Sequence, residues 1–290
     1  MEKAKQRIKE YIYNKSTELN LSDLKLKELS INLSHGLPTS LQILHCSRNQ
    51  IKELPINLPA SLRRLYCSDN QIKELPINLP SSLQTLYCSN NQIKELPINL
   101  PDSLQTLDCS NNEIKELPTN LPTSLQKLYC SSNKIEELPS NLPVNLQTLY
   151  CSNNNIKELP INLPVYLQTL YCSVNQIKEL PKKFPAFIHE LYCCDNQIKE
   201  LPINFPVSLQ TLQCSNNQYM YVHKINTERF GIIETPNYNK KVIIIQKRWK
   251  IYKSRKIIIK MIDSKDNMLS TSFNNYGDIN IINLIIEYIY

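Results

Sequence analysis

The sequence has very little glycine and no long apolar run. Only three of the 290 residues are glycine, and they are scattered at Gly36, Gly231 and Gly277. This excludes a glycine-rich loop of the kind that wraps phosphates. No stretch approaches the roughly 18 apolar residues of a membrane helix. The start of the chain is charged, unlike a secretion signal. We therefore expect no membrane segment and a reducing cytoplasmic compartment, where thiols stay free.

Metal-binding and cofactor-binding motifs are also missing. The four histidines lack a spacing such as HxxxH, and the ten cysteines form no CxxC. A tetrahedral metal site needs such clustered ligands. We predict no cofactor, no metal site and no catalytic residues.

The net charge of +7 is uneven along the chain. Residues 1–40 carry 7 basic and 5 acidic side chains, and residues 41–217 carry 14 and 15. Residues 218–290 carry 12 and 6, and nine basic residues with no acidic one lie between Lys240 and Lys260. A protein that binds nucleic acid along its whole length would be basic throughout. Here the excess of basic residues is concentrated in one segment, residues 240–260.

What the sequence does have is one repeat of 21 residues. Nine copies of LxxLxCxxNxIxxLPxxLPxx run without insertion from Leu41 to about Asn217. Each copy has one asparagine at the same place, and we call these nine residues the ladder asparagines: Asn49, Asn70, Asn91, Asn112, Asn133, Asn154, Asn175, Asn196 and Asn217.

This template resembles the leucine-rich repeat family, whose core pattern is LxxLxLxxNxL. The double Leu-Pro spacer is similar to the short-repeat class of secreted bacterial effectors and of many giant-virus repeat proteins. If the chain is viral, the compartment is the host cytoplasm. The resemblance implies an α/β-type solenoid that is mostly β and irregular, with parallel strands on a concave face. It also implies a non-catalytic scaffold that binds a protein partner.

The residues themselves favour the same fold. Side chains alternate along a strand, so the second leucine and the cysteine of LxxLxC point to one side. Two prolines in each spacer remove backbone donors and fix φ, which favours an extended convex side over a helix. The ladder asparagines mark the turn that leaves the sheet, where their side chains satisfy backbone groups.

Both ends of such an array need covering. We predict a cap helix in residues 1–18, with Ile8, Tyr11 and Ile12 at helical spacing. A degenerate first repeat follows in 19–40, with Leu24 at the asparagine place, and a basic cap region occupies 218–290.

The cysteines recur at the sixth template position. A disulfide ladder is unlikely because nine is an odd number and strand neighbours hold their Cβ atoms apart. We interpret these cysteines as small buried hydrophobes. Cys194, which replaces a serine, is the exception and is expected to be more exposed.

The position before each cysteine points the other way and is the candidate partner-binding face. It forms a tyrosine stripe interrupted by one aspartate: Tyr66, Tyr87, Asp108, Tyr129, Tyr150, Tyr171 and Tyr192. Tyrosine is enriched at interface hot spots, but neighbouring rings also stack for stability, and both roles stay open. Charged departures from the consensus lie beside the stripe: Arg63, Arg64, Lys127, Glu190 and Asp195.

The last quarter offers two interpretations. "IQKRWKIYKSR" resembles the IQ motif of calmodulin-binding helices, with matches at Ile245, Gln246, Lys250 and Arg255 but Ile251 where glycine is preferred. The apolar runs at the two ends of this segment are also typical of two strands in a β-rich cap. We favour the cap over the calmodulin-binding helix. Nucleic-acid binding through 240–260 is a further alternative. A ubiquitin-ligase domain, found behind similar repeats in effectors, does not fit into the 73 residues that follow the repeats.

Overall fold

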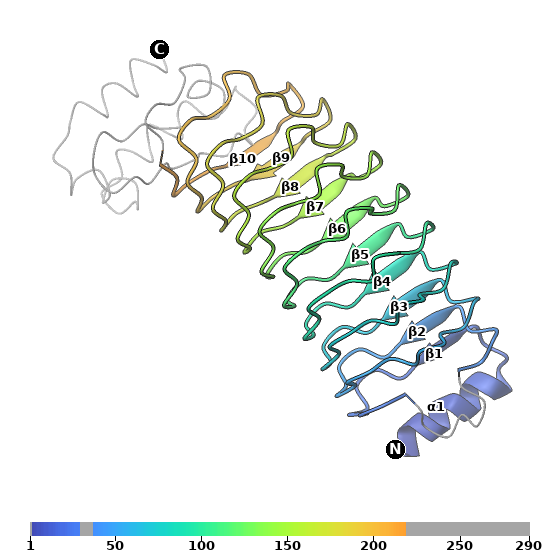
Figure 1. The fold of residues 1–290 in the computed structure, drawn as a ribbon. Coiled ribbons are helices and arrows are strands. Elements are labelled where there is room, and N and C mark those ends of the chain that lie inside the picture. The colour runs from blue at the N-terminus through green and yellow to red at the C-terminus, as the bar shows by residue number, and fades with distance from the viewer. Residues whose placement is uncertain (1, 30–36, 219–290) are drawn as a thin grey trace, which may run out of the picture. The chain divides into compact units, whose positions relative to one another are not determined.

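The structure, a computed structural model, describes residues 2–29 and 37–218. Within these ranges it contains one helix and ten strands that follow one another along a repeat array (Figure 1). The helix, α1, spans Glu2–Tyr13, and the first strand, β1, spans Glu18–Asn20. The other nine strands, one per 21-residue repeat, are β2 (Ile43–His45), β3 (Arg64–Tyr66), β4 (Thr85–Tyr87), β5 (Thr106–Asp108), β6 (Lys127–Tyr129), β7 (Thr148–Tyr150), β8 (Thr169–Tyr171), β9 (Glu190–Tyr192) and β10 (Thr211–Gln213).

The strands form a single parallel sheet in chain order, β1 to β10. Each residue pairs with its counterpart in the next repeat, as in Leu65 with Leu86 and Tyr66 with Tyr87. A constant repeat length keeps this register from one end to the other. The predicted solenoid of parallel strands is confirmed.

The template positions decide what is buried. In each strand the central leucine is buried and its two neighbours are more exposed, as in β4, where Leu86 is fully buried. The cysteine after the strand and the isoleucine of the spacer are also fully buried, as Cys88 and Ile93 show. Because every repeat contributes the same side chains, the core continues through the array, each layer packing on the next.

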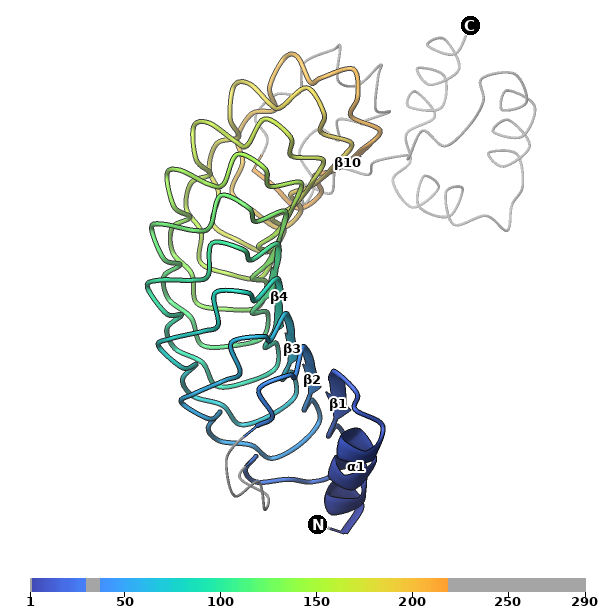
Figure 2. The same ribbon diagram turned by 90° about the vertical axis from the view of Figure 1, so that its right-hand side faces the viewer.

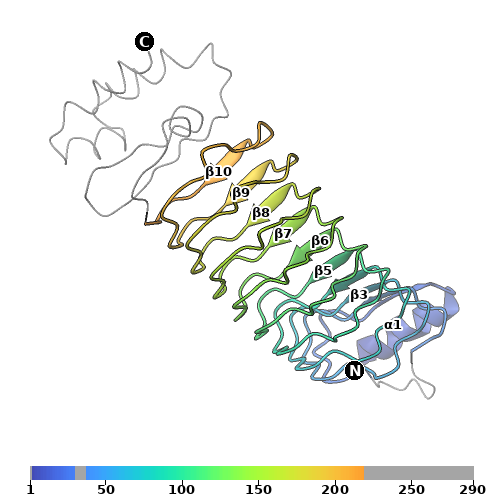
Figure 3. The same ribbon diagram turned by 45° about the horizontal axis from the view of Figure 1, so that its top comes forward.

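The spacers are extended, as the prolines predict. Within the described residues no helix or strand interrupts a spacer between two consecutive repeats, apart from a single bridge residue at Glu200. The repeats stack into an arc, with the strands on its inner side and the spacers on the outer side (Figure 2). A tilted view shows the strands side by side, one per repeat (Figure 3).

The ladder asparagines hold neighbouring repeats together. The Asn112 side chain accepts a hydrogen bond from the Ile93 amide at 2.9 Å and donates to the Cys88 carbonyl at 3.1 Å, both in the preceding repeat. It also donates to the Cys109 carbonyl of its own repeat at 3.0 Å. The other ladder asparagines repeat these contacts, except that Asn49 bonds to the amides of Leu24 and Leu26 in the degenerate repeat. The ladder therefore consists of asparagine-to-backbone bonds that bridge repeats.

Helix α1 contacts β1 and buries Ala4, Ile8 and Tyr11. Ile12, which we expected on the same apolar face, is 60% exposed. A helix advances about 100° per residue, so Ile12 lies about 80° around the axis from Ala4, at the rim of the buried face. The Tyr11 hydroxyl lies 3.2 Å from the hydroxyl of Ser40, the residue just before the first complete repeat.

Several predictions concern residues outside the described ranges. These are the IQ-like segment with Ile245, Gln246, Lys250 and Arg255, and the basic region 218–290 beyond its first residue. Calmodulin binding, nucleic-acid binding and the four-segment division of the chain stay predictions.

Candidate partner-binding face

The tyrosine stripe crosses the sheet at the last residue of each strand. The tyrosines of β3, β4, β6, β7, β8 and β9 are half-buried, and their backbones pair directly with one another or with Asp108 of β5. Each strand presents its tyrosine opposite the buried leucine, because successive side chains alternate between the two faces. The six tyrosines are thereby brought together on the inner side of the arc.

Asp108 divides the stripe into two groups of rings in contact. In the first group, Tyr66 stacks on His45 at 4.5 Å between centroids and on Tyr87 at 5.3 Å. The second group is Tyr129, Tyr150, Tyr171 and Tyr192. Its centroid distances run from 5.0 Å for Tyr129–Tyr150 to 4.2 Å for Tyr171–Tyr192. These contacts are typical of stabilising aromatic pairs and also leave a broad amphipathic surface.

Packing of the rings raises the pKa of several phenols. Burial among neighbouring rings raises the pKa of Tyr87 and of Tyr129, with smaller contributions from adjacent tyrosines and Asp108. The pKa of Tyr171 is raised most, first by burial and then by a hydrogen bond that its hydroxyl donates to Glu190 at 2.9 Å. The raised pKa keeps these three phenols protonated at neutral pH.

Charged side chains punctuate the face at a few strands. Arg63 and Arg64 lie next to each other at β3 and are both exposed. Lys127 begins β6 and pairs in register with Thr106, two residues before Asp108. Asp195, in the turn after β9, accepts a hydrogen bond from Asn216 at 2.8 Å.

The cysteines form a buried column behind the sheet. All nine cysteines of the template are fully buried, whereas Cys194 is intermediate in exposure. Burial raises the pKa of the Cys46 and Cys172 thiols to about 12, and that of Cys88 well above its usual range. A thiol that stays protonated is a poor nucleophile and a poor metal ligand. Among the described residues, no group of three or more His, Cys, Asp or Glu side chains is arranged to hold a metal ion.

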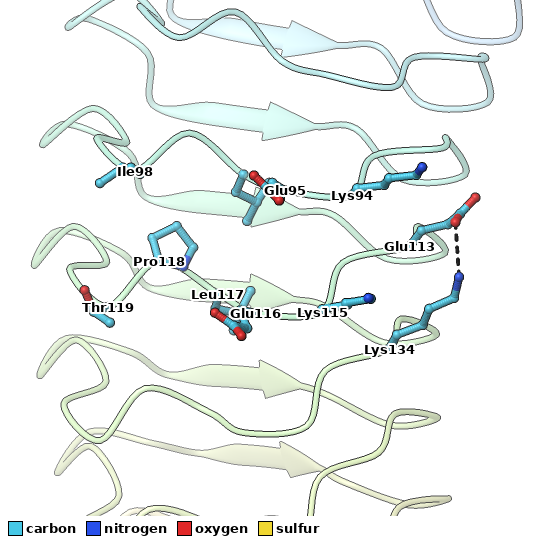
Figure 4. Close-up of a pocket in the computed structure, with 11 residues that line it drawn as sticks. Lys94, Glu95, Ile98, Glu113, Lys115, Glu116, Leu117, Pro118, Thr119 and Lys134 are labelled. Carbon is cyan, nitrogen blue, oxygen red and sulfur yellow. Dashed lines mark hydrogen bonds and ion pairs between the residues drawn. The ribbon is translucent and has the colours of Figure 1, made fainter.

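A hollow of about 680 Å³ lies on the spacer wall between the third and fourth complete repeats (Figure 4). Leu96, Leu117 and Pro118 form its apolar part, and a Glu113–Lys134 ion pair of 3.1 Å closes one end. Its three lysines and three glutamates balance, and the Lys-Glu pair recurs in neighbouring repeats. Neither charge nor chemistry sets this hollow apart as a ligand site.

Sequence reasoning missed a change at the edge where each spacer meets its strand. In four successive repeats a serine hydroxyl lies 2.6–2.7 Å from the carbonyl oxygens of the residues 20 and 22 positions earlier in the chain: Ser61, Ser82, Ser103 and Ser124. Two later repeats have Tyr166 and Phe187 there, about half exposed and with ring centroids 6.1 Å apart. The sequence signal for this change was the replacement, in these two repeats, of a serine that otherwise recurs at 21-residue intervals.

Comparison with known proteins agrees with this architecture. Family models described as "Leucine Rich repeats (2 copies)" match residues 60–102, 81–122 and 102–143, and one described as "Leucine Rich Repeat" matches 145–164. A structure of YopM from Yersinia enterocolitica is 35% identical over 71% of this chain, with a TM-score of 0.58. The chain belongs to the leucine-rich repeat family. It spans about half of that YopM chain, covering 48% of it.

Two further solved structures have a similar leucine-rich repeat architecture. The leucine-rich repeat domain of a Shigella effector is 32% identical, with 67% of this chain and 76% of that chain covered and a TM-score of 0.49. An internalin, InlF, from Listeria monocytogenes shares the fold at 21% identity and a TM-score of 0.57, over 71% of this chain and 69% of its own. A search of curated proteins returned no match. In the described part of this leucine-rich repeat chain, no helix is long and apolar enough to cross a membrane.

Proposed function

We propose that this leucine-rich repeat array is a non-catalytic scaffold that binds a protein partner on its inner, strand-bearing face. The observation that carries the proposal is the row of six half-buried tyrosines, which the parallel register brings onto one surface. Tyrosine offers a large rigid contact area and a polar tip, and it is enriched where binding energy concentrates. The buried, protonated cysteines support a scaffold over a thiol enzyme.

A host-directed role is a narrower form of this proposal. It rests on the similarity to a protein described as a Shigella effector. In this form of the proposal the array is an adaptor whose inner face engages a host protein. Loss of host-protein capture by the tyrosine variant described next, with no loss of proteins captured from a bacterial lysate, would support it.

The proposal is tested by affinity capture with the full chain. In one variant Tyr87, Tyr129, Tyr150 and Tyr171 become Ala. In the matched control four spacer isoleucines that are 79–88% exposed on the outer wall become Ala: Ile56, Ile77, Ile98 and Ile161.

We expect the tyrosine variant to lose the captured partner and the isoleucine variant to retain it. Circular dichroism establishes that both variants are folded. A folded tyrosine variant that captures the same proteins as the unaltered chain contradicts the proposal.

A further inference from the structure

The charged residues of the inner face are distributed by sign. Most strand positions on this face hold glutamine, threonine or tyrosine. Three arginines lie toward the N-terminal end: Arg48 follows β2, and Arg63 and Arg64 lie at β3. At the other end β9 begins with Glu190, and Asp195 follows that strand.

The arginines near β2 and β3 carry charges that no ion pair neutralises within the described residues. All three arginines are exposed, and none forms an ion pair within the described ranges. Three carboxylates lie nearby: Glu18 of β1, which lies 3.0 Å from His45, Asp23 in the turn after β1, and Asp69 in the turn after β3. At β2 and β3 the three arginines outnumber the one carboxylate, Asp69, which leaves a net positive charge there. Guanidinium groups suit a bidentate carboxylate.

The acidic end combines a carboxylate with aromatic rings. The Tyr171 hydroxyl donates to Glu190 at 2.9 Å, and the rings of Tyr150 and Tyr192 lie on either side of Tyr171, each 4.2 Å away between centroids. Neither Glu190 nor Asp195 pairs with a cation in the part of the chain described by the structure. A carboxylate beside tyrosine faces suits an ammonium or guanidinium group, because ion pairing and cation–π attraction act together.

The middle of the face is electrically balanced. Asp108 of β5 and Lys127 of β6 carry opposite charges on adjacent strands. The amide of Ser110 donates to the Asp108 carboxylate at 3.0 Å. The face is thus positive at β2 and β3, neutral at β5 and β6, and negative at β9.

We propose that the partner binds as an extended segment lying along the inner face, with an acidic residue at Arg63 and Arg64 and a basic residue at Glu190. This inference rests on the function proposed above and adds the chemistry of the partner. The sheet takes six strand-to-strand steps from β3 to β9, which at about 4.8 Å each amount to about 29 Å. An extended chain advances about 3.3 Å per residue, so the two partner charges lie about nine residues apart.

The test is selection of displayed random 14-residue peptides on the immobilised full chain. We expect the enriched peptides to carry an Asp or Glu and a Lys or Arg about nine positions apart. A variant in which Arg63 and Arg64 both become Glu should select a basic residue in place of the acidic one. Enriched peptides that depend on the tyrosines but show no such charge pair overturn this inference and leave the proposed function standing. No enrichment, or enrichment unaffected by the four tyrosine changes, overturns both.

One enriched peptide then serves as a probe of the individual charges. Glu190→Gln should weaken its binding about tenfold, the size expected when one charge pair of about 1.4 kcal/mol is lost. Lys52→Gln on the spacer wall is the matched control and should leave the affinity unchanged. Equal affinities for the unaltered chain and Glu190→Gln overturn the assigned position of the basic residue.

Discussion

The residue before each ladder asparagine adopts a left-handed backbone. In all nine repeats φ at this position lies between 52° and 56°, and the residues are Arg48, Asp69, Asn90, Asn111, Ser132, Asn153, Val174, Asp195 and Asn216. Asparagine and aspartate tolerate this conformation because their short side chains bond locally. The repeats achieve with asparagine and aspartate what many turns achieve with glycine. Arg48, Ser132 and Val174 are the exceptions, and of these only Val174 has a β-branched side chain, which crowds the backbone there.

Replacing Val174 should therefore stabilise the protein. We expect Val174→Asn to raise the free energy of unfolding by about 1 kcal/mol, by removing the left-handed strain of a β-branched residue. Urea denaturation measures the change. The matched control is Val165→Asn, another valine with a similar exposed fraction (55% against 49%) but without a positive φ. Val174→Asn at or below the stability of the unaltered chain would contradict the explanation.

Between neighbouring elements, the ladder asparagine is the decisive contact. Each asparagine side chain forms hydrogen bonds with an amide and a carbonyl of the preceding repeat and with a carbonyl of its own repeat. One side chain therefore joins two turns of the solenoid. Its position and its turn role were predictable from the repeat. Which backbone groups it joins depended on how the repeats stack.

Asn112→Ala should cost about 2–4 kcal/mol of unfolding free energy, because it leaves several buried backbone groups without a partner. Asn99→Ala, at an exposed spacer asparagine, is the matched control and should cost less than about 0.5 kcal/mol. Both are measured by urea denaturation monitored by circular dichroism. Similar losses in the two variants would show that the ladder contacts contribute little.

For the residues of the inner face, too, the repeat predicted part of the arrangement and the stacking of the repeats decided the rest. Alternation along LxxLxC is enough to place the tyrosines opposite the buried leucines. Stacking of neighbouring rings was one of the two roles left open by the sequence. The geometry of each ring pair and the Tyr171–Glu190 hydrogen bond were not predictable, because they join side chains 19 to 21 positions apart whose rotamers depend on their neighbours. Ile12 was misplaced for a related reason, since only packing against β1 decides which part of α1 is covered.

At the scale of the whole molecule, eight buried thiols with a raised pKa make stability depend on pH. Burial raises the pKa of each buried thiol that shows a shift, to about 12 for Cys46 and Cys172. An unfolded thiol ionises near pH 8.5, so above this pH the unfolded chain binds fewer protons than the folded one. Their contribution is complete below about pH 8.5 and is lost as the pH rises toward the folded pKa.

We therefore expect the free energy of unfolding, measured in urea with a reductant, to fall steeply above about pH 9. Each buried thiol contributes up to about 1.4 kcal/mol per pH unit to this slope. Cys130→Ala should make the slope less steep by that amount, although it lowers the stability itself. Tyrosine and lysine titrations are common to both proteins, so an unchanged slope in Cys130→Ala would refute the linkage.

The sequence by itself determined the repeat, the parallel solenoid, the buried cysteines and the face on which the tyrosines lie. These features follow from the periodicity of the sequence. The template recurs in every copy, and the constant length of 21 residues keeps the strands of successive copies in register. The tertiary structure alone decided the ring pairs, the bonds that cross between repeats, the left-handed turn at Val174 and the separation of positive and negative ends on the inner face. Each of these depends on the distance between residues in different repeats, and that distance exists only once the repeats have stacked.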